Sequence, residues 1–160
     1  MAIESRSGNR LAPGLTLLAS ALGEETTQSG TTVDVVQLAG LNVPAAASLL
    51  LTFSARKTAG AAATASLGLR YNAVPVLDNF AVFSAADQAE NGHCQVWIPP
   101  GLANYGRGAF RGNRLGAIVD AGFTAERPAA ALTALTITGL VGDVLVTLGV
   151  SQVRLYAFTL

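Results

Sequence analysis

Two stretches of the sequence alternate between apolar and polar residues with a period of two, one over residues 48–56 and one over 63–72. In the first stretch the odd positions are apolar and the even positions are polar, with Leu50 as the single exception. Because successive side chains of a β-strand point to opposite faces, each stretch predicts a strand with one buried face. Gly60 lies between them and can take the positive φ of a tight turn, so the two stretches predict an antiparallel hairpin.

The C-terminal third of the chain alternates in the same way, which predicts strands at 135–141 and 143–150. The final stretch, 152–160, differs because it carries apolar residues on both faces. Chain ends fray unless other parts of the protein hold them. We therefore expect this last strand to be central in its sheet or to lie in a subunit interface.

Further short segments predict strands at 31–38, 79–85, 93–99 and 116–123, whereas helical patterning is weak and confined to 15–25 and 126–135. Short strands without interleaved helices are typical of sandwiches. The sequence therefore predicts an all-β fold, namely an antiparallel two-sheet sandwich of jelly-roll or related Greek-key type with about eight strands. We expect a single sandwich domain over 15–160, preceded by an extended N-terminal arm over 1–14.

The composition bears on how such a sandwich meets its surroundings. Charged residues make up 12% of the chain, against about 25% in a typical globular domain. Hydrophobic residues reach 51% and the formal net charge is zero. A surface with so little charge indicates burial in an interface between subunits, because obligate interfaces resemble a divided core. We expect a homo-oligomer, with an unusually uncharged monomer as the alternative.

Membrane insertion is the other explanation for low charge. The uncharged run 35–55 is long enough to span a bilayer. However, it contains Pro44 and several polar residues, and its second half alternates as a strand does. The first residues contain Glu4 and no apolar segment, so no signal peptide is visible. We expect no membrane partner.

Candidate catalytic and metal-binding residues are few. Ser54 and Lys57 match the S-x-x-K spacing of acyl-transferring serine enzymes, but they lie at a predicted strand end rather than on a helical turn. Asp87, Glu90 and His93 would converge only on a helix, which the Asn-Gly pair before His93 interrupts. The lone cysteine excludes an intrachain disulfide. We expect no enzymatic activity, no metal and no other cofactor.

The stretch 104–116 is the one plainly basic part of the chain, with three arginines among four glycines and two aromatic residues. Such a segment suits either RNA or a neighbouring protein. It is short and lies in a neutral chain, which favours protein contact over nucleic acid. We predict a loop between the strands at 93–99 and 116–123. The residues expected to make protein contacts, in this loop and in the last strand, are Tyr105, Arg107, Phe110, Arg111, Arg114, Arg154, Tyr156 and Phe158.

Taken over most of its length, the chain resembles virion structural proteins, in particular the small β-sandwich auxiliary proteins that decorate tailed-phage heads. The features that carry this resemblance are the strand-rich stretches "AAATASLGLRYNAV" and "TALTITGLVGDVLVTLGV", the polar start "MAIESRSGNRLAPG" and the final strand "SQVRLYAFTL". The resemblance implies a trimer or another ring that binds the major capsid protein or another virion protein. It implies location in the virion after assembly in the host cytoplasm, with no direct genome binding.

Two alternatives stay open. One is a receptor- or glycan-binding sandwich of a tail fibre or cell surface, whose aromatic candidates for sugar stacking are Trp97, Tyr105 and Phe110. The other is a major coat protein with a single sandwich. Coats that package RNA directly bring a basic arm to neutralise phosphates. Here Arg6 and Arg10 in the first 30 residues stand against three glutamates, which argues against genome contact.

Overall fold

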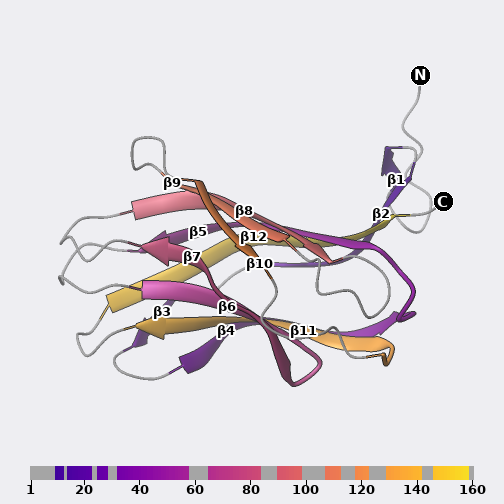
Figure 1. The fold of residues 1–160 in the computed structure, drawn as a ribbon, viewed down its shortest axis with the longest axis horizontal. Coiled ribbons are helices and arrows are strands. Elements are labelled where there is room, and N and C mark those ends of the chain that lie inside the picture. Colours follow the sequence, from indigo (N-terminus) through magenta and orange to yellow (C-terminus); the bar gives the residue numbers. More distant parts are fainter. Residues whose placement is uncertain are drawn as a thin grey trace.

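The computed structural model describes residues 10–12, 14–22, 25–28, 32–57, 65–83, 90–98, 107–112, 118–122, 129–141 and 146–158. These residues form twelve β-strands and no helix, so the all-β prediction is confirmed (Figure 1). The strands are β1 (Arg10–Ala12), β2 (Leu15–Ala21), β3 (Glu25–Gln28), β4 (Thr32–Val43), β5 (Leu49–Lys57), β6 (Ala65–Tyr71), β7 (Val74–Phe83), β8 (Glu90–Ile98), β9 (Arg107–Gly112), β10 (Ile118–Gly122), β11 (Leu132–Val141) and β12 (Val146–Phe158).

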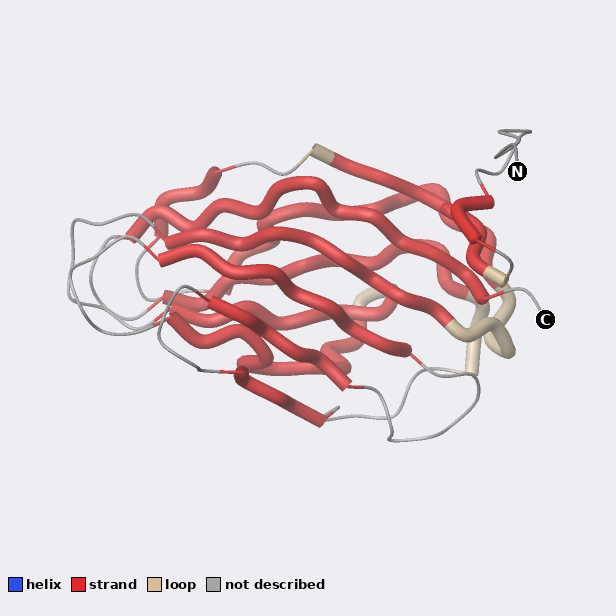
Figure 2. Tube along the Cα trace, turned by 90° about the horizontal axis from the view of Figure 1, so that it is seen from above, coloured by secondary structure: helices blue, strands red, loops and turns tan. Residues whose placement is uncertain are grey.

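The strands form two antiparallel sheets that pack face to face as a sandwich, as Figure 2 shows from above. The large sheet has eight strands, in the order β1-β2-β12-β5-β8-β9-β10, with β3 also paired to β12. The small sheet has four, in the order β4-β11-β6-β7. The last two strands, β11 and β12, thus lie in the interior of the two sheets, beside strands formed much earlier in the chain. This non-sequential order is typical of jelly-roll and related Greek-key sandwiches.

The core lies between the two sheets and follows the predicted alternation. On β5 the side chains of Leu49, Leu51 and Phe53 are at most 1% exposed. Leu67 and Leu69 on β6 are equally buried and face them from the small sheet. Full burial of each such side chain stabilises the fold by about 1.5–3 kcal/mol. The assignment of these residues to a buried face is therefore confirmed.

The predicted hairpin between 48–56 and 63–72 is wrong. Strand β5 pairs with β12 and β8 in the large sheet, whereas β6 pairs with β11 and β7 in the small one. Alternation specifies which side chains need burial, but it does not specify the hydrogen-bonded neighbour. The two apolar faces cover each other across the sandwich instead of lying side by side.

The helical interpretation of 15–25 is also wrong, because Leu15–Ala21 forms β2 and pairs with β12. Ala19 and Ala21 pack against the core from this strand. Intrinsic helix preference is a weak signal, and a sheet edge that offers a hydrogen-bonding partner overrides it. Of the stretch 126–135, the part from Leu132 onward belongs to β11.

The expectation of a central C-terminal strand is confirmed, since β12 has β5 on one side and both β2 and β3 on the other. At the opposite terminus, Arg10–Ala12 forms β1 and pairs with β2, while residues 1–9 lie outside the described part of the chain. Within the described residues, no helix is long and apolar enough to cross a membrane.

A polar side chain ties the β6–β7 turn to the start of β11. Asn72 has a φ of 52°, in the left-handed region that asparagine tolerates better than most residues. Its Nδ2 donates a hydrogen bond to the Ala131 carbonyl (3.1 Å). Its Oδ1 accepts hydrogen bonds from the Thr133 amide (2.8 Å), the Thr133 hydroxyl (3.0 Å) and the Ala134 amide (3.2 Å). These contacts fix one end of the small sheet.

Candidate binding surface

An aromatic cluster lies on the outer face of the large sheet. On β5, Leu50 pairs with Trp97 of β8 on one side and with Tyr156 of β12 on the other. The Trp97 ring stacks on Phe158, with ring centroids 5.2 Å apart and an angle of 21° between the planes. Trp97 is nevertheless 51% exposed, whereas Tyr156 is only 8% exposed. We call Leu50, Trp97, Tyr156 and Phe158 the aromatic patch.

Hydrogen-bonding side chains continue along the same strands, away from the aromatic patch. Thr52 of β5 lies between Gln95 of β8 and Arg154 of β12. The next outward position of β5, Ser54, pairs with His93. Gln95, His93 and Arg154 are exposed. Together with the neighbouring Gln152 these side chains form what we call the polar patch, namely Thr52, Ser54, His93, Gln95, Gln152 and Arg154.

A β-bulge lies in the polar patch. The register between β12 and β5 shifts between Ser151 and Arg154, and Gln152 has a φ of 54°. Both Ser151 and Gln152 are exposed, although the strand on either side of them alternates. Left-handed backbone at a residue other than glycine costs about 1–3 kcal/mol, and bulges often redirect side chains at functional sites. The bulge inserts one extra residue into β12, so that the alternation resumes beyond it with Arg154 pointing outward.

Charged residues are few on the outer face of this sheet. Arg56 and Arg154 are exposed at outward positions of β5 and β12. The register also places Glu25 opposite Gly149 of β12 and Asp120 in the row of Gln95. Among the described residues, no hydrogen bond or ion pair joins Arg154, Gln95 or His93 to another side chain. The chemistry that these groups offer is that of hydrogen-bond donors and, at Arg154, a permanent positive charge.

The basic stretch that was predicted as a loop lies in this sheet. Arg107–Gly112 forms β9, which pairs with β8 and β10, so the loop prediction is wrong for these residues. The glycines suggested turns, but glycine also adopts extended backbone, and hydrogen bonding to strands on both sides stabilises it there. The register places Arg107 opposite Trp97 and Arg111 opposite His93.

The other predicted contact residues are distributed differently. Arg154, Tyr156 and Phe158 lie on the outer face, as just described, so the sheet brings them close to positions 107 and 111. Phe110 pairs with Cys94, which is buried, and its position therefore lies on the inner face, away from both patches. Tyr105 and Arg114 lie outside the described residues.

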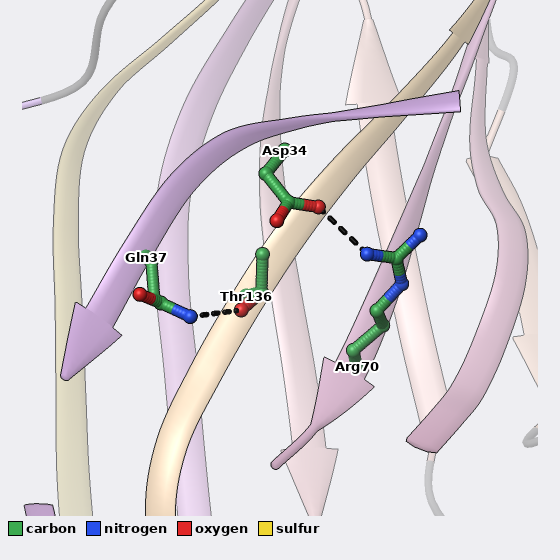
Figure 3. A network of polar contacts seen from close by, with 4 residues as sticks. All are labelled: Asp34, Gln37, Arg70 and Thr136. Carbon is green, nitrogen blue, oxygen red and sulfur yellow. Dashed lines mark hydrogen bonds and ion pairs between the residues drawn. The ribbon is translucent and has the colours of Figure 1, made fainter. Parts of the chain in front are cut away.

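The outer face of the small sheet is polar in a different way (Figure 3). Arg70 of β6 forms an ion pair with Asp34 of β4 across the intervening β11, with 2.8 Å between Nη1 and Oδ1. Gln37 Nε2 donates a hydrogen bond to the Thr136 hydroxyl at 3.2 Å. Thr136 is only 3% exposed. On this face the polar side chains bind one another.

The candidate catalytic and metal-binding groups are separated by the pleat of the sheet. Lys57 is 1% exposed on the inner face, while Ser54 points outward from the same strand. His93 and Cys94 likewise point to opposite faces of β8. Burial raises the pKa of the Cys94 thiol well above its usual value. The described residues contain no group of three histidine, cysteine or acidic side chains placed to hold a metal, and Asp87 lies outside them.

The sequence analysis did not identify the Trp97–Phe158 stack or the bulge at Gln152. A signal for the first exists in the stretch "HCQVWIP", where Trp97 occupies the polar side of an alternating strand, next to His93 and Gln95. A large aromatic residue at such a position indicates a contact surface. No comparable sequence signal marks the bulge, because Ser151 and Gln152 are ordinary strand-compatible residues.

Neither a scan of protein-family profiles nor a comparison with curated proteins finds a match to this chain. Among solved structures, the chain is similar to the binding domain of botulinum neurotoxin DC in complex with rat synaptotagmin II, at 11% identity and a TM-score of 0.42. That match covers 96% of this chain and 42% of the other, so this chain spans less than half of its length. Alginate lyase Aly36B matches at 9% identity and a TM-score of 0.35, covering 91% of this chain and 81% of the other. The fold assignment rests on the sheet order given above.

Proposed function

We propose that the protein is a non-enzymatic structural subunit that assembles with copies of itself through the aromatic patch, as a decorating subunit of a virion. The observation that carries the proposal is the Trp97 side chain, 51% exposed on an open sheet face and stacked on Phe158. Interface hot spots are enriched in tryptophan and tyrosine surrounded by apolar contacts. The aromatic patch has this composition.

The geometry supports protein contact because the patch is already ordered. The stack between Trp97 and Phe158 and the burial of Tyr156 fix the rings before a partner arrives. Pre-ordered aromatic groups lose little side-chain entropy on binding, so most of their burial contributes to affinity. Position 107, opposite Trp97, provides an arginine next to the patch. Arginine is one of the residues enriched in interfaces.

The virion setting rests on the chain as a whole. A content of 12% charged residues fits a subunit that has much of its surface covered in an assembly. The resemblance to small β-sandwich decoration proteins points to a ring of copies seated on the major capsid protein. The C-terminal strand β12, central in the large sheet, then presents Phe158 beside the exposed Trp97 to the neighbouring copy.

Sedimentation velocity across a concentration series tests this proposal, with Trp97→Ala compared with Leu140→Ala. Leu140 is 42% exposed on the small sheet and serves as the matched control, because it is another partly exposed apolar side chain on a strand. We expect Trp97→Ala to raise the dissociation constant of the assembly by at least about tenfold. Leu140→Ala should sediment as the wild type does. A wild-type protein that stays monomeric, or equal behaviour of the two variants, contradicts the proposal.

A receptor- or glycan-binding module is the second candidate function. The observation that favours it is the polar patch, which places exposed amide, imidazole and guanidinium groups on the same face as the aromatic patch.

A further inference from the structure

We infer that the polar patch on the outer face of the large sheet is a binding site for an acidic polysaccharide. The site is distinct from the aromatic patch, and the inference does not depend on assembly of the subunit. It is carried by the side chains that β5, β8 and β12 place together, by their charge and by the strained bulge among them.

The first step is the arrangement of donors and acceptors. Gln95, Thr52 and Arg154 lie in one row across three neighbouring strands. Adjacent strands are about 4.8 Å apart, so this row spans about 10 Å. His93 and Ser54 form a second row, two residues or about 7 Å further along the strands. The patch is therefore open and broad, which suits an extended chain lying on the sheet.

The second step is the chemical match. Sugar hydroxyls both donate and accept hydrogen bonds, and the patch offers two amides, two hydroxyls and an imidazole for them. A uronate or sulfate group needs a cation with several N–H donors, which the Arg154 guanidinium supplies in a planar, bidentate geometry. Arg154 is exposed and forms no ion pair with any other residue in the described segments. The register places position 111, an arginine, opposite His93 in the second row.

The third step is the charge of the surroundings. The six side chains of the patch include no carboxylate. The nearest acidic positions in the sheet are Asp120, two strands beyond Gln95 in the same row, and Glu25, which pairs with Gly149 of β12. The protein as a whole has a formal net charge of zero. Nucleic-acid binding gains much of its affinity from neutralising many phosphates, and it usually involves a broadly basic protein. Local cations among many neutral donors on a neutral protein favour an acidic polysaccharide over a nucleic acid.

The fourth step is the backbone. At the bulge, Gln152 has a φ of 54°, and its side chain is exposed beside Arg154. Without the bulge, the inward and outward positions of β12 would exchange beyond residue 152. Arg154 would then point into the core. The strained residue therefore has a definite effect, which is to present Arg154 on the same face as Gln95 and Thr52.

Affinity electrophoresis of the full chain with polygalacturonate, heparin and neutral dextran tests the inference. We expect retardation by at least one of the two acidic polymers and none by dextran. Arg154→Gln should weaken that binding by at least about tenfold, because a hydrogen-bonded charge is lost. Arg70→Gln is the matched control, since it removes the same charge from the small sheet, and it should bind as the wild type does.

Gln95→Ala separates recognition from simple charge attraction. It leaves the net charge unchanged and should weaken binding by about fivefold, because it removes a neutral hydrogen-bonding group. The inference is overturned if neither acidic polymer binds or if Arg70→Gln weakens binding as much as Arg154→Gln. It is also overturned if Gln95→Ala has no effect, or if a single-stranded oligonucleotide binds more tightly than both acidic polymers. Trp97→Ala should leave polymer binding intact, because Trp97 belongs to the aromatic patch. Polymer binding and assembly can therefore fail independently, and each outcome bears on one proposal only.

Discussion

The outer faces of the two sheets use their polar side chains in opposite ways. On the small sheet, Asp34 pairs with Arg70, and Gln37 donates to Thr136, so these side chains are partners of one another. On the large sheet, Arg154 points outward and makes no ion pair with any described residue. These contacts of the small-sheet face thus lie within that face, whereas Arg154 on the large sheet has no such partner among the described residues.

The apolar side chains show the same contrast. The large sheet gathers its outward aromatic groups in one place, where Trp97 stacks on Phe158. Among the described side chains of the small sheet, Leu140 and Val74 are exposed, as scattered apolar residues are on most protein surfaces. Under our proposals, the polar side chains on the outer face of the small sheet serve mainly stability, and those on the large sheet serve mainly binding. Substitutions on the small sheet should therefore change mainly the stability, and substitutions on the large sheet should change mainly assembly or binding.

Asn72→Ala should have the largest effect on stability, because it removes the side chain that joins the β6–β7 turn to β11. The variant loses four hydrogen bonds and places alanine at a φ of 52°. We expect the free energy of unfolding to fall by about 2–4 kcal/mol, measured by denaturant titration. Asn72→Asp keeps the accepting oxygen and should lose clearly less. If Asn72→Ala were as stable as the wild type, polar groups near the small sheet would not have the stabilising role that we assign to them.

Cys94 tests whether inner and outer faces of β8 are assigned correctly. Burial raises its pKa above the ordinary value of 9.0, so the folded state keeps the thiol proton after the unfolded state has lost it. The stability that this group contributes is therefore complete below pH 9 and declines as the pH rises above it. We expect the wild type to lose up to about 1.4 kcal/mol per pH unit relative to Cys94→Ala in this range. Parallel curves for the two proteins would place Cys94 in contact with solvent.

Asp34→Ala should have the smallest effect on stability. The side chains of Arg70 and Asp34 are 32% and 54% exposed, so solvent screens their attraction. Exposed ion pairs contribute about 0–1 kcal/mol, and we expect a loss within that range in the same titration. Because the ion pair lies on the outer face of the small sheet, away from the aromatic patch, the variant should also leave assembly unchanged. A loss above about 2 kcal/mol would mean that the pair is far less screened than its exposure indicates.

Much of the fold follows from the sequence, because burial determines it. The alternation at 48–56 identifies Leu49, Leu51 and Phe53 as core residues, and all three are buried. The hydrogen-bonded partners of each strand could not be predicted from the alternation. The reason is that β5 and β6 pack their apolar faces against each other but do not hydrogen-bond to each other. The strand at Arg107–Gly112 was missed because its glycines suggest turns, while its stability comes from β8 and β10 on either side.

The candidate site was predicted only in part. The last strand was expected to be covered on both faces, and Tyr156 is buried on the outer one. The pairing of Leu50 with Trp97 and Tyr156 joins residues distant in sequence, which no local pattern encodes. The role of the bulge at Gln152 depends on the register between β12 and β5, so it emerges only once the sheet is assembled.

The most direct test of the central claim, that the outer face of the large sheet is the contact surface, uses the single tryptophan of the chain as its own probe. Trp97 is 51% exposed in one subunit, so acrylamide should quench its fluorescence efficiently when the protein is dilute and monomeric. We predict that quenching falls as the concentration rises and the subunits assemble, in step with the mass measured by sedimentation. Assembly without any change in the quenching of Trp97 would contradict the account.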